Sequence, residues 1–351
     1  MLLKNKVSKL IVCVLATSTI ASSAFGAENI DWGFYSTIEA LATKSAGEFT
    51  TNFDPHQLAI FFSVNDEESK CSFHFENEWE HGYQTNASKI KSSDGGKMVL
   101  EKANVGCDFG GVKVTAGVFQ LPMTEWDRGA YVPYRTTQLR PGFTRKTAPF
   151  IQAGYMAETR LSIFNLATFY TNGGDSGVID ANKEKAAGGL LELAPFEWLR
   201  FGGTAYLEGQ DLGGYKKATT NGHLVLGNSN EGDETFAVLQ LESSIATRTA
   251  LPVNSVGDSA SSLSDHVQSG YYAQLLFPIG DWKAGARQDY YDPNSESTGD
   301  AKTTSSAFVN LNWGGESLDH NFKLELHSVG TDGSTEKDSI IDFTWAVVYQ
   351  N

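Results

Sequence analysis

The sequence predicts an all-β protein, a transmembrane antiparallel β-barrel of about 16 strands with short periplasmic turns and long external loops. Three observations lead to this prediction. The 351-residue chain begins with an export signal, alternating apolar and polar segments fill the rest of it, and the connections between these segments fall into two length classes. After the first thirty residues, no apolar run is long enough for a membrane-spanning helix.

Residues 1–26 have the features of a secretory signal peptide. Three lysines precede a mostly apolar segment, and the small residues Ala24 and Gly26 stand where cleavage requires them. We therefore expect cleavage after Gly26 and a single barrel domain over residues 27–351. A buried or membrane helix is the less favoured alternative, because the apolar segment is short and its flanks are those of an export signal.

Composition narrows the class of protein. Loss of the three signal-peptide lysines takes the net charge from -15 to -18, which does not suit binding to nucleic acid. A soluble protein and a barrel both fit the composition. In an alternating membrane strand, the polar residues lower the hydropathy averaged over a sequence window, so the strand does not stand out as apolar.

Strict alternation marks the strands. In Cys71 to Glu80, apolar residues fall on one face and polar residues on the other, because alternate side chains of a strand point to opposite sides. The segment near residues 222–228 has the weakest alternation. It is predicted as a strand because, without it, short and long connections would no longer alternate along the chain. The predicted strands are 33–43, 56–65, 71–81, 97–109, 112–121, 148–158, 160–172, 183–194, 197–209, 219–228, 234–246, 267–279, 281–291, 303–313, 320–330 and 338–350.

The connections alternate between short and long along the chain, which is typical of an outer-membrane barrel and not of a soluble β-sandwich. The short class is 66–70, 110–111, 159, 195–196, 229–233, 280 and 314–319. The long class is 44–55, 82–96, 122–147, 173–182, 210–218, 247–266, 292–302 and 331–337.

Several segments resemble the phosphate-selective (O and P type) porins of Gram-negative outer membranes. These are the hairpin over 270–293, the segments at 309–313 and 322–326, and the strand at 114–122. The resemblance implies a porin in the outer membrane, in contact with its lipid, that assembles as a homotrimer and passes small hydrophilic solutes or ions. The sequence departs from the family pattern at Gln120, where the family often has a basic residue.

Residues 122–147 form the third long loop, which in sixteen-stranded porins commonly folds into the channel and narrows it. We expect an anion-attracting constriction, because guanidinium groups suit carboxylate and phosphate. The alternative is that the arginines tie the loop to acidic wall residues such as Glu76 and Glu78. The candidate constriction residues are Glu125, Asp127, Arg128, Tyr134, Arg135, Arg140, Arg145 and Lys146.

The alternation also assigns charged residues of both signs to the lumen. They set a transverse field across the pore, or alternatively are solvated groups that pair with one another. The candidate wall residues are Glu76, Glu78, Arg200, Lys283, Arg287 and Lys323.

Export leaves two cysteines, Cys71 and Cys107, near the short-turn rim of neighbouring predicted strands. An oxidising compartment permits a disulfide between them, and two small apolar wall residues are the alternative.

We expect no enzyme activity, cofactor or metal, because the seven histidines lack metal-ligand spacing and no catalytic motif is evident. The alternatives to a passive channel are a structural or adhesive barrel with acidic external loops and, less favoured, a barrel enzyme.

Overall fold

The computed structural model describes residues 30–45, 47–80, 97–128, 141–144, 147, 151–173, 185–209, 216–227, 237–248, 266–295, 297–315 and 317–350. The predicted signal peptide over residues 1–26 lies outside these ranges. Within them, no helix is long and apolar enough to cross a membrane.

Sixteen strands and one short helix make up the described fold. In chain order they are β1 (Ile30–Ser45), β2 (Glu48–Asp66), β3 (Cys71–Glu80), β4 (Lys97–Asp108), β5 (Val112–Gln120), α2 (Glu125–Arg128), β6 (Ile151–Leu161), β7 (Phe164–Thr171), β8 (Ala186–Phe196), β9 (Leu199–Gly209), β10 (Lys216–Leu226), β11 (Val238–Arg248), β12 (His266–Ile279), β13 (Trp282–Asp292), β14 (Lys302–Gly314), β15 (Leu318–Thr331) and β16 (Lys337–Gln350).

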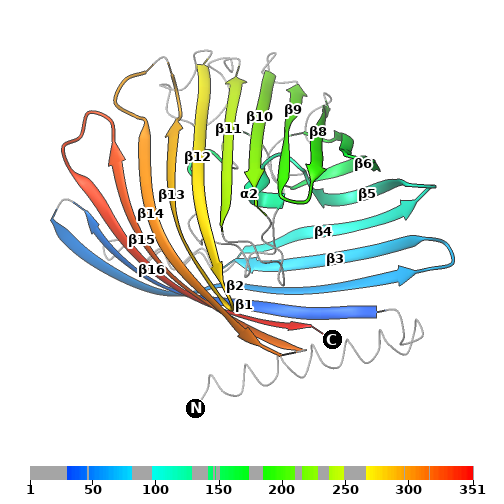
Figure 1. The fold of residues 1–351 in the computed structure, drawn as a ribbon, viewed down its shortest axis with the longest axis horizontal. Coiled ribbons are helices and arrows are strands. Elements are labelled where there is room, and N and C mark those ends of the chain that lie inside the picture. Colours follow the sequence, from blue (N-terminus) through cyan, green and yellow to red (C-terminus); the bar gives the residue numbers. More distant parts are fainter. Residues whose placement is uncertain are drawn as a thin grey trace.

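The strands form one closed antiparallel barrel in which each strand pairs with its neighbours in sequence (Figure 1). The barrel closes between the first and last strands, where Phe34 lies opposite Tyr349 and Thr37 opposite Ala346. Closure leaves no free strand edge, which a membrane requires because lipid cannot satisfy backbone polar groups. The structure therefore confirms the predicted fold class, and it confirms the tenth strand, which pairs with both β9 and β11.

The two faces of the wall differ in polarity. In β15, the polar side chains Lys323 and Glu325 are buried on the inner face, whereas Leu324 and Leu326 are 43% and 51% exposed on the outer face. The other strands alternate in the same sense, with exposed apolar residues such as Leu207 and Ile245. Exposed apolar side chains in alternate positions around a closed barrel fit a lipid-facing surface.

Aromatic residues border this apolar surface at both ends. Trp198, Trp282 and Trp313 are exposed beside short turns, and Tyr155 and Tyr271 are exposed further along their strands, toward the long connections. Amphipathic rings at these two levels match the aromatic girdles that transmembrane barrels place at the membrane–water interfaces.

One predicted long loop is wrong. The connection expected at 44–55 is a hairpin, since β1 and β2 stay paired until Ser45 lies opposite Glu48. Gly47 permits the tight turn with φ of 83°. The sequence of this segment does not predict a strand, because its threonines and charged residues do not form an apolar face.

Two predicted short turns are placed too early in the chain. Thr159 lies in the ladder opposite Val112, and the reversal occurs at residues 162–163, where Ser162 has φ of 55°. The turn predicted at 195–196 occurs at residues 197–198, because Phe196 pairs with Leu199. A register shift before this pair accommodates Pro195, which cannot donate to a regular ladder. The predicted turn at 229–233 lies outside the described residues.

Candidate channel constriction

The connection between β5 and β6 turns into the barrel directly after Gln120. Leu121 and Met123 are almost fully buried and belong to a cluster that includes Phe119, Met156 and Tyr206 from the inner face of the wall. The alternation of β5, β6 and β9 presents these apolar side chains inward, where they would otherwise face water. The first residues of the connection thus pack across the inner face of the barrel.

The N-terminus of α2 docks on β11. The backbone amides of Glu125 and Trp126 donate to the carboxylate of Glu242 at 2.9 and 3.4 Å, and the side-chain amide of Asn221 donates to the same carboxylate at 2.7 Å. The first amides of a helix have no partner within it, so a carboxylate placed opposite satisfies them. Glu242 therefore fixes the start of α2 against β11.

An ion-pair network ties α2 to β8, β9 and β10. Arg128 pairs with Glu192 at 3.0 Å and with Glu125 at 3.6 Å, and Arg200 pairs with Glu125 through a short contact. His223 lies 2.8 Å from the same oxygen of Glu192. The charges of Arg128 and Arg200 are thus balanced by two carboxylates that are themselves nearly fully buried.

The same carboxylates and imidazole supply metal-ligand atoms. One such atom from each of Glu125, Glu192 and His223 lies within 4.8 Å of the others. Both carboxylates already pair with guanidinium groups, so a divalent cation would enter a group whose charge is balanced. In the structure, the contacts of these residues anchor the loop to the wall.

The return of the connection is anchored on β12 and β13. The Phe143 ring is fully buried and stacks on Tyr272, with ring centroids 6.1 Å apart. A Cβ at Gly270 would lie 2.3 Å from the Cβ of Phe143, so only glycine allows this approach. The amide of Gly142 also donates to Asp289 at 3.3 Å.

Polar contacts complete this anchor at the end of the connection. The Thr147 carbonyl accepts from the Thr219 hydroxyl at 2.5 Å, and the Thr147 hydroxyl accepts from Ser244 at 2.9 Å. Arg287 lies 5.0 Å from the ring centroid of Trp126. Trp126 and Phe143, one from each end of the connection, belong to one buried cluster with Tyr272, so the two ends share one patch of the wall. Both described ends of the connection therefore contact inner-face residues of β8–β13, far in sequence from β5 and β6.

Several predicted constriction residues are not covered by the structure. Glu125 and Arg128 are placed as described above. Outside the described residues lie Tyr134, Arg135, Arg140, Arg145 and Lys146, together with the side chain of Asp127. Arg128 pairs with an acidic wall residue, as the alternative interpretation expected, but this residue is Glu192 of β8 in place of the suggested Glu76 or Glu78.

The predicted acidic wall residues have partners within the wall. Glu76 pairs with Lys102 at 2.7 Å. Glu78 accepts from Gln57 at 2.5 Å and from Tyr35 at 3.2 Å. These bonds join β1, β2, β3 and β4 on their inner faces and stiffen this part of the wall.

The predicted basic wall residues lie on inward rows of their strands. Arg287 and Lys323 are buried, Lys283 is half-buried in the same row as Arg287, and the Arg200 side chain is 36% exposed. Arg287 is paired with Asp289 at 3.2 Å. The inner face thus combines both signs of charge, much of it in pairs.

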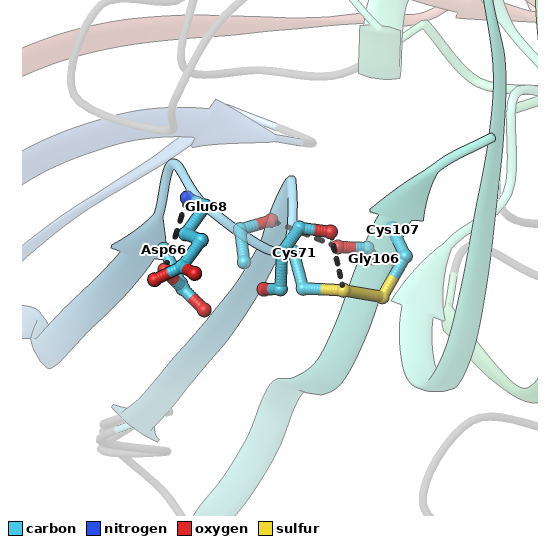
Figure 2. The surroundings of a disulfide bond; sticks show 7 residues. Asp66, Glu68, Cys71, Gly106 and Cys107 are labelled. Atoms are coloured by element: carbon cyan, nitrogen blue, oxygen red, sulfur yellow. Dashed lines mark hydrogen bonds between the residues drawn. A yellow bond between two sulfur atoms is a disulfide. The ribbon is translucent and has the colours of Figure 1, made fainter. Parts of the chain in front are cut away.

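A disulfide joins Cys71 and Cys107 (Figure 2). The two residues are directly opposed in the ladder between β3 and β4, beside the turns at 67–70 and 109–111. They occupy the row of Phe73 and Val105, on the outward face near the short-turn rim. The bond links the two ends of the β3–β4 hairpin at this rim.

Sequence reasoning missed Glu192, His223 and Glu242. Each stands at an inward position of an alternating segment, and this position is the only feature of the sequence that indicates a lumen-facing role. Alternation predicts only the face of a strand. The partner depends on how the loop crosses the barrel, which alternation does not encode.

The geometry defines a sixteen-stranded porin-type barrel with an inward-anchored third connection. The sequence matches no protein-family model and no curated protein. Solved structures do share the fold. The anion-selective porin from Comamonas acidovorans has a TM-score of 0.62 at 12% identity, covering 92% of this chain and 99% of that one.

Two further porin-type structures are similar. OprB of Pseudomonas putida has a TM-score of 0.60 at 9% identity, covering 92% of this chain and 94% of that one. OmpF of Salmonella typhi has a TM-score of 0.58 at 9% identity, covering 92% of this chain and 98% of that one. At these identities the likeness establishes the fold. The sequence resemblance to the phosphate-selective porins stays a prediction.

Proposed function

We propose that the chain is an outer-membrane porin, a passive diffusion channel for small hydrophilic solutes that assembles as a homotrimer. The observation that carries this proposal is the third connection, whose described ends bind the inner faces of β8–β13. A barrel with structural or adhesive function has no need to anchor a loop across its interior. The apolar outer face and polar inner face support a water-filled, membrane-embedded barrel.

The proposed channel is narrowest where the third connection crosses the barrel. The anchor uses a buried aromatic stack and an ion-pair network, which hold the ends of the connection at fixed positions. A constriction of this kind limits solute size, and its charged side chains determine which ions enter.

We propose that anion preference is set by Arg135, Arg140, Arg145 and Lys146 and not by Arg128. The charge of Arg128 is balanced by Glu192 and Glu125, so it adds little to the field in the pore. The fold shared with an anion-selective porin supports an anion preference. Since Gln120 is neutral, chloride and small organic anions are better test ions than phosphate.

Reversal potentials in planar bilayers under a salt gradient test this proposal. Wild type should show discrete conductance steps and an anion-favouring reversal potential. The double variant Arg135→Ala, Arg140→Ala should shift this potential toward cations. Lys44→Gln is the matched control, because this exposed lysine lies at the long-loop end of β1 on the outward row.

Each outcome has a clear meaning. Conductance with a cation-favouring reversal potential that both variants leave unchanged would refute the anion preference and leave the channel intact. Failure of the folded wild-type protein to form any conductance steps would refute the channel itself and return attention to a structural barrel.

A further inference from the structure

A cavity of about 570 Å³ lies inside the barrel on the short-turn side of the third connection. Its lining comes from β4 to β8, from the turn after β4, and from the connection, including Arg128. Ligand cavities in proteins commonly have volumes of about 300–1,000 Å³. Arg128 of the ion-pair network also lines the cavity, whereas none of the described β11–β13 residues that anchor the connection does.

The deep part of the cavity is apolar. Leu121, Met156, Ala167 and Leu190 line it, and each is no more than 8% exposed. Inward-facing wall residues of a water-filled barrel are expected to be polar. An apolar floor at this position can therefore bind the apolar part of a solute.

The mouth of the cavity carries both signs of charge. Asp108, Lys113 and Glu158 lie directly opposite one another on β4, β5 and β6. Arg160 is two residues after Glu158 and so faces the same side. Asp108, Lys113 and Arg160 are exposed, which places the charged end of the cavity toward solvent near the short-turn rim.

The two cations at the mouth are available to a ligand. Neither Lys113 nor Arg160 makes an ion pair or a side-chain hydrogen bond with any residue that the structure describes. Directly opposed residues of antiparallel strands have Cβ atoms about 4.5–5.5 Å apart, so opposite charges alternate at close spacing along this row. A ligand with an ammonium and a carboxylate on one carbon matches such a row.

We propose that this cavity binds a small zwitterion with an apolar body, namely an apolar α-amino acid or a short peptide of such amino acids. The carboxylate is bound by Lys113 and Arg160, the ammonium by Glu158, which lies opposite Lys113, and the apolar side chain packs against the floor of the cavity. The inference deepens the proposed channel function, because it names a solute class that the channel would admit and retain.

Saturation-transfer NMR on the purified barrel in detergent tests this inference, with L-phenylalanine as the probe. We expect saturable binding, with transfer strongest on the ring protons. Two analogues serve as controls, 3-phenylpropionate without the ammonium and phenethylamine without the carboxylate. Each should bind about tenfold more weakly than L-phenylalanine, because each lacks one charge-assisted contact.

Variants locate the binding site. Arg160→Gln and Lys113→Gln should each weaken L-phenylalanine binding about three- to tenfold. Ala167→Leu should abolish it by filling the floor. Lys44→Gln should bind as wild type does. The two mouth variants change exposed side chains, so they test the inference even if Ala167→Leu fails to fold.

The outcomes separate this inference from the channel proposal. Absence of saturable binding, equal binding of either analogue, or unchanged affinity in both mouth variants would each overturn the zwitterion site. Conductance steps without L-phenylalanine binding would overturn the site alone. Binding without conductance would support the site and overturn the channel.

Discussion

Phe143 offers the sharpest test of the anchor that holds the third connection. Its ring is 0% exposed and stacks on Tyr272 beside Gly270. Replacing a buried phenylalanine with alanine commonly costs about 3–5 kcal/mol. Taking about 3 kcal/mol for the docking of the connection, Phe143→Ala should raise the undocked population roughly a hundredfold.

The remaining contacts of this segment are already present in the wild type, so they do not compensate for the loss of the Phe143 ring. Three hydrogen bonds hold the same segment, from Gly142 to Asp289 and from Thr219 and Ser244 to Thr147. Each contributes about 1 kcal/mol. The variant connection should therefore leave the wall often enough to be seen as current fluctuation.

Single-channel recording and amide hydrogen exchange measure this effect together. Phe143→Ala should give noisier, larger conductance steps and faster exchange at the amides of Thr144 and Thr147. Phe49→Ala is the matched control, because Phe49 is 63% exposed and its loss should change stability by less than about 0.5 kcal/mol. If Phe143→Ala kept wild-type steps and wild-type exchange, the assigned anchor would be incorrect.

Two further predictions concern the ion-pair network and the disulfide. Glu192→Gln should destabilise the docked loop by about 3–5 kcal/mol, since it removes the carboxylate shared by Arg128 and His223, and the result would be seen as increased channel noise. Unaltered channel noise would show that the ion-pair network is not needed to hold the third connection against the wall. The double variant Cys71→Ser, Cys107→Ser should lower the free energy of unfolding by about 4 kcal/mol, because the disulfide closes a separation of 36 residues in the unfolded chain. The urea midpoint measures this loss, and a midpoint equal to that of the oxidised wild type would contradict it.

The sequence was informative about the wall because a strand with one lipid-facing side must alternate. Segments such as Cys71–Glu80 show that alternation directly, and the structure has a strand at the same residues. The regular alternation of short and long connections was enough to predict β10, in which the alternation of apolar and polar residues is weak. The β1–β2 hairpin was missed because beyond Ala42 the two strands have no continuous apolar row.

The candidate site was predictable only as a loop number and a set of charged residues. Arg128 was assigned to the correct connection, but its partner Glu192 is 64 residues away and was not identified. That contact depends on the path of the connection across the barrel. Gly270 illustrates the same limit, because its importance arises from the close approach of Phe143 and not from its own strand.

The central claim is that the third connection crosses and narrows a water-filled channel. Single-channel conductance tests it most directly, comparing wild type with a variant in which a glycine–serine linker of equal length replaces residues 129–140. We predict discrete steps for both, with larger conductance and a larger solute size limit for the variant. Equal conductance and equal size limits, with both proteins folded, would contradict the claim.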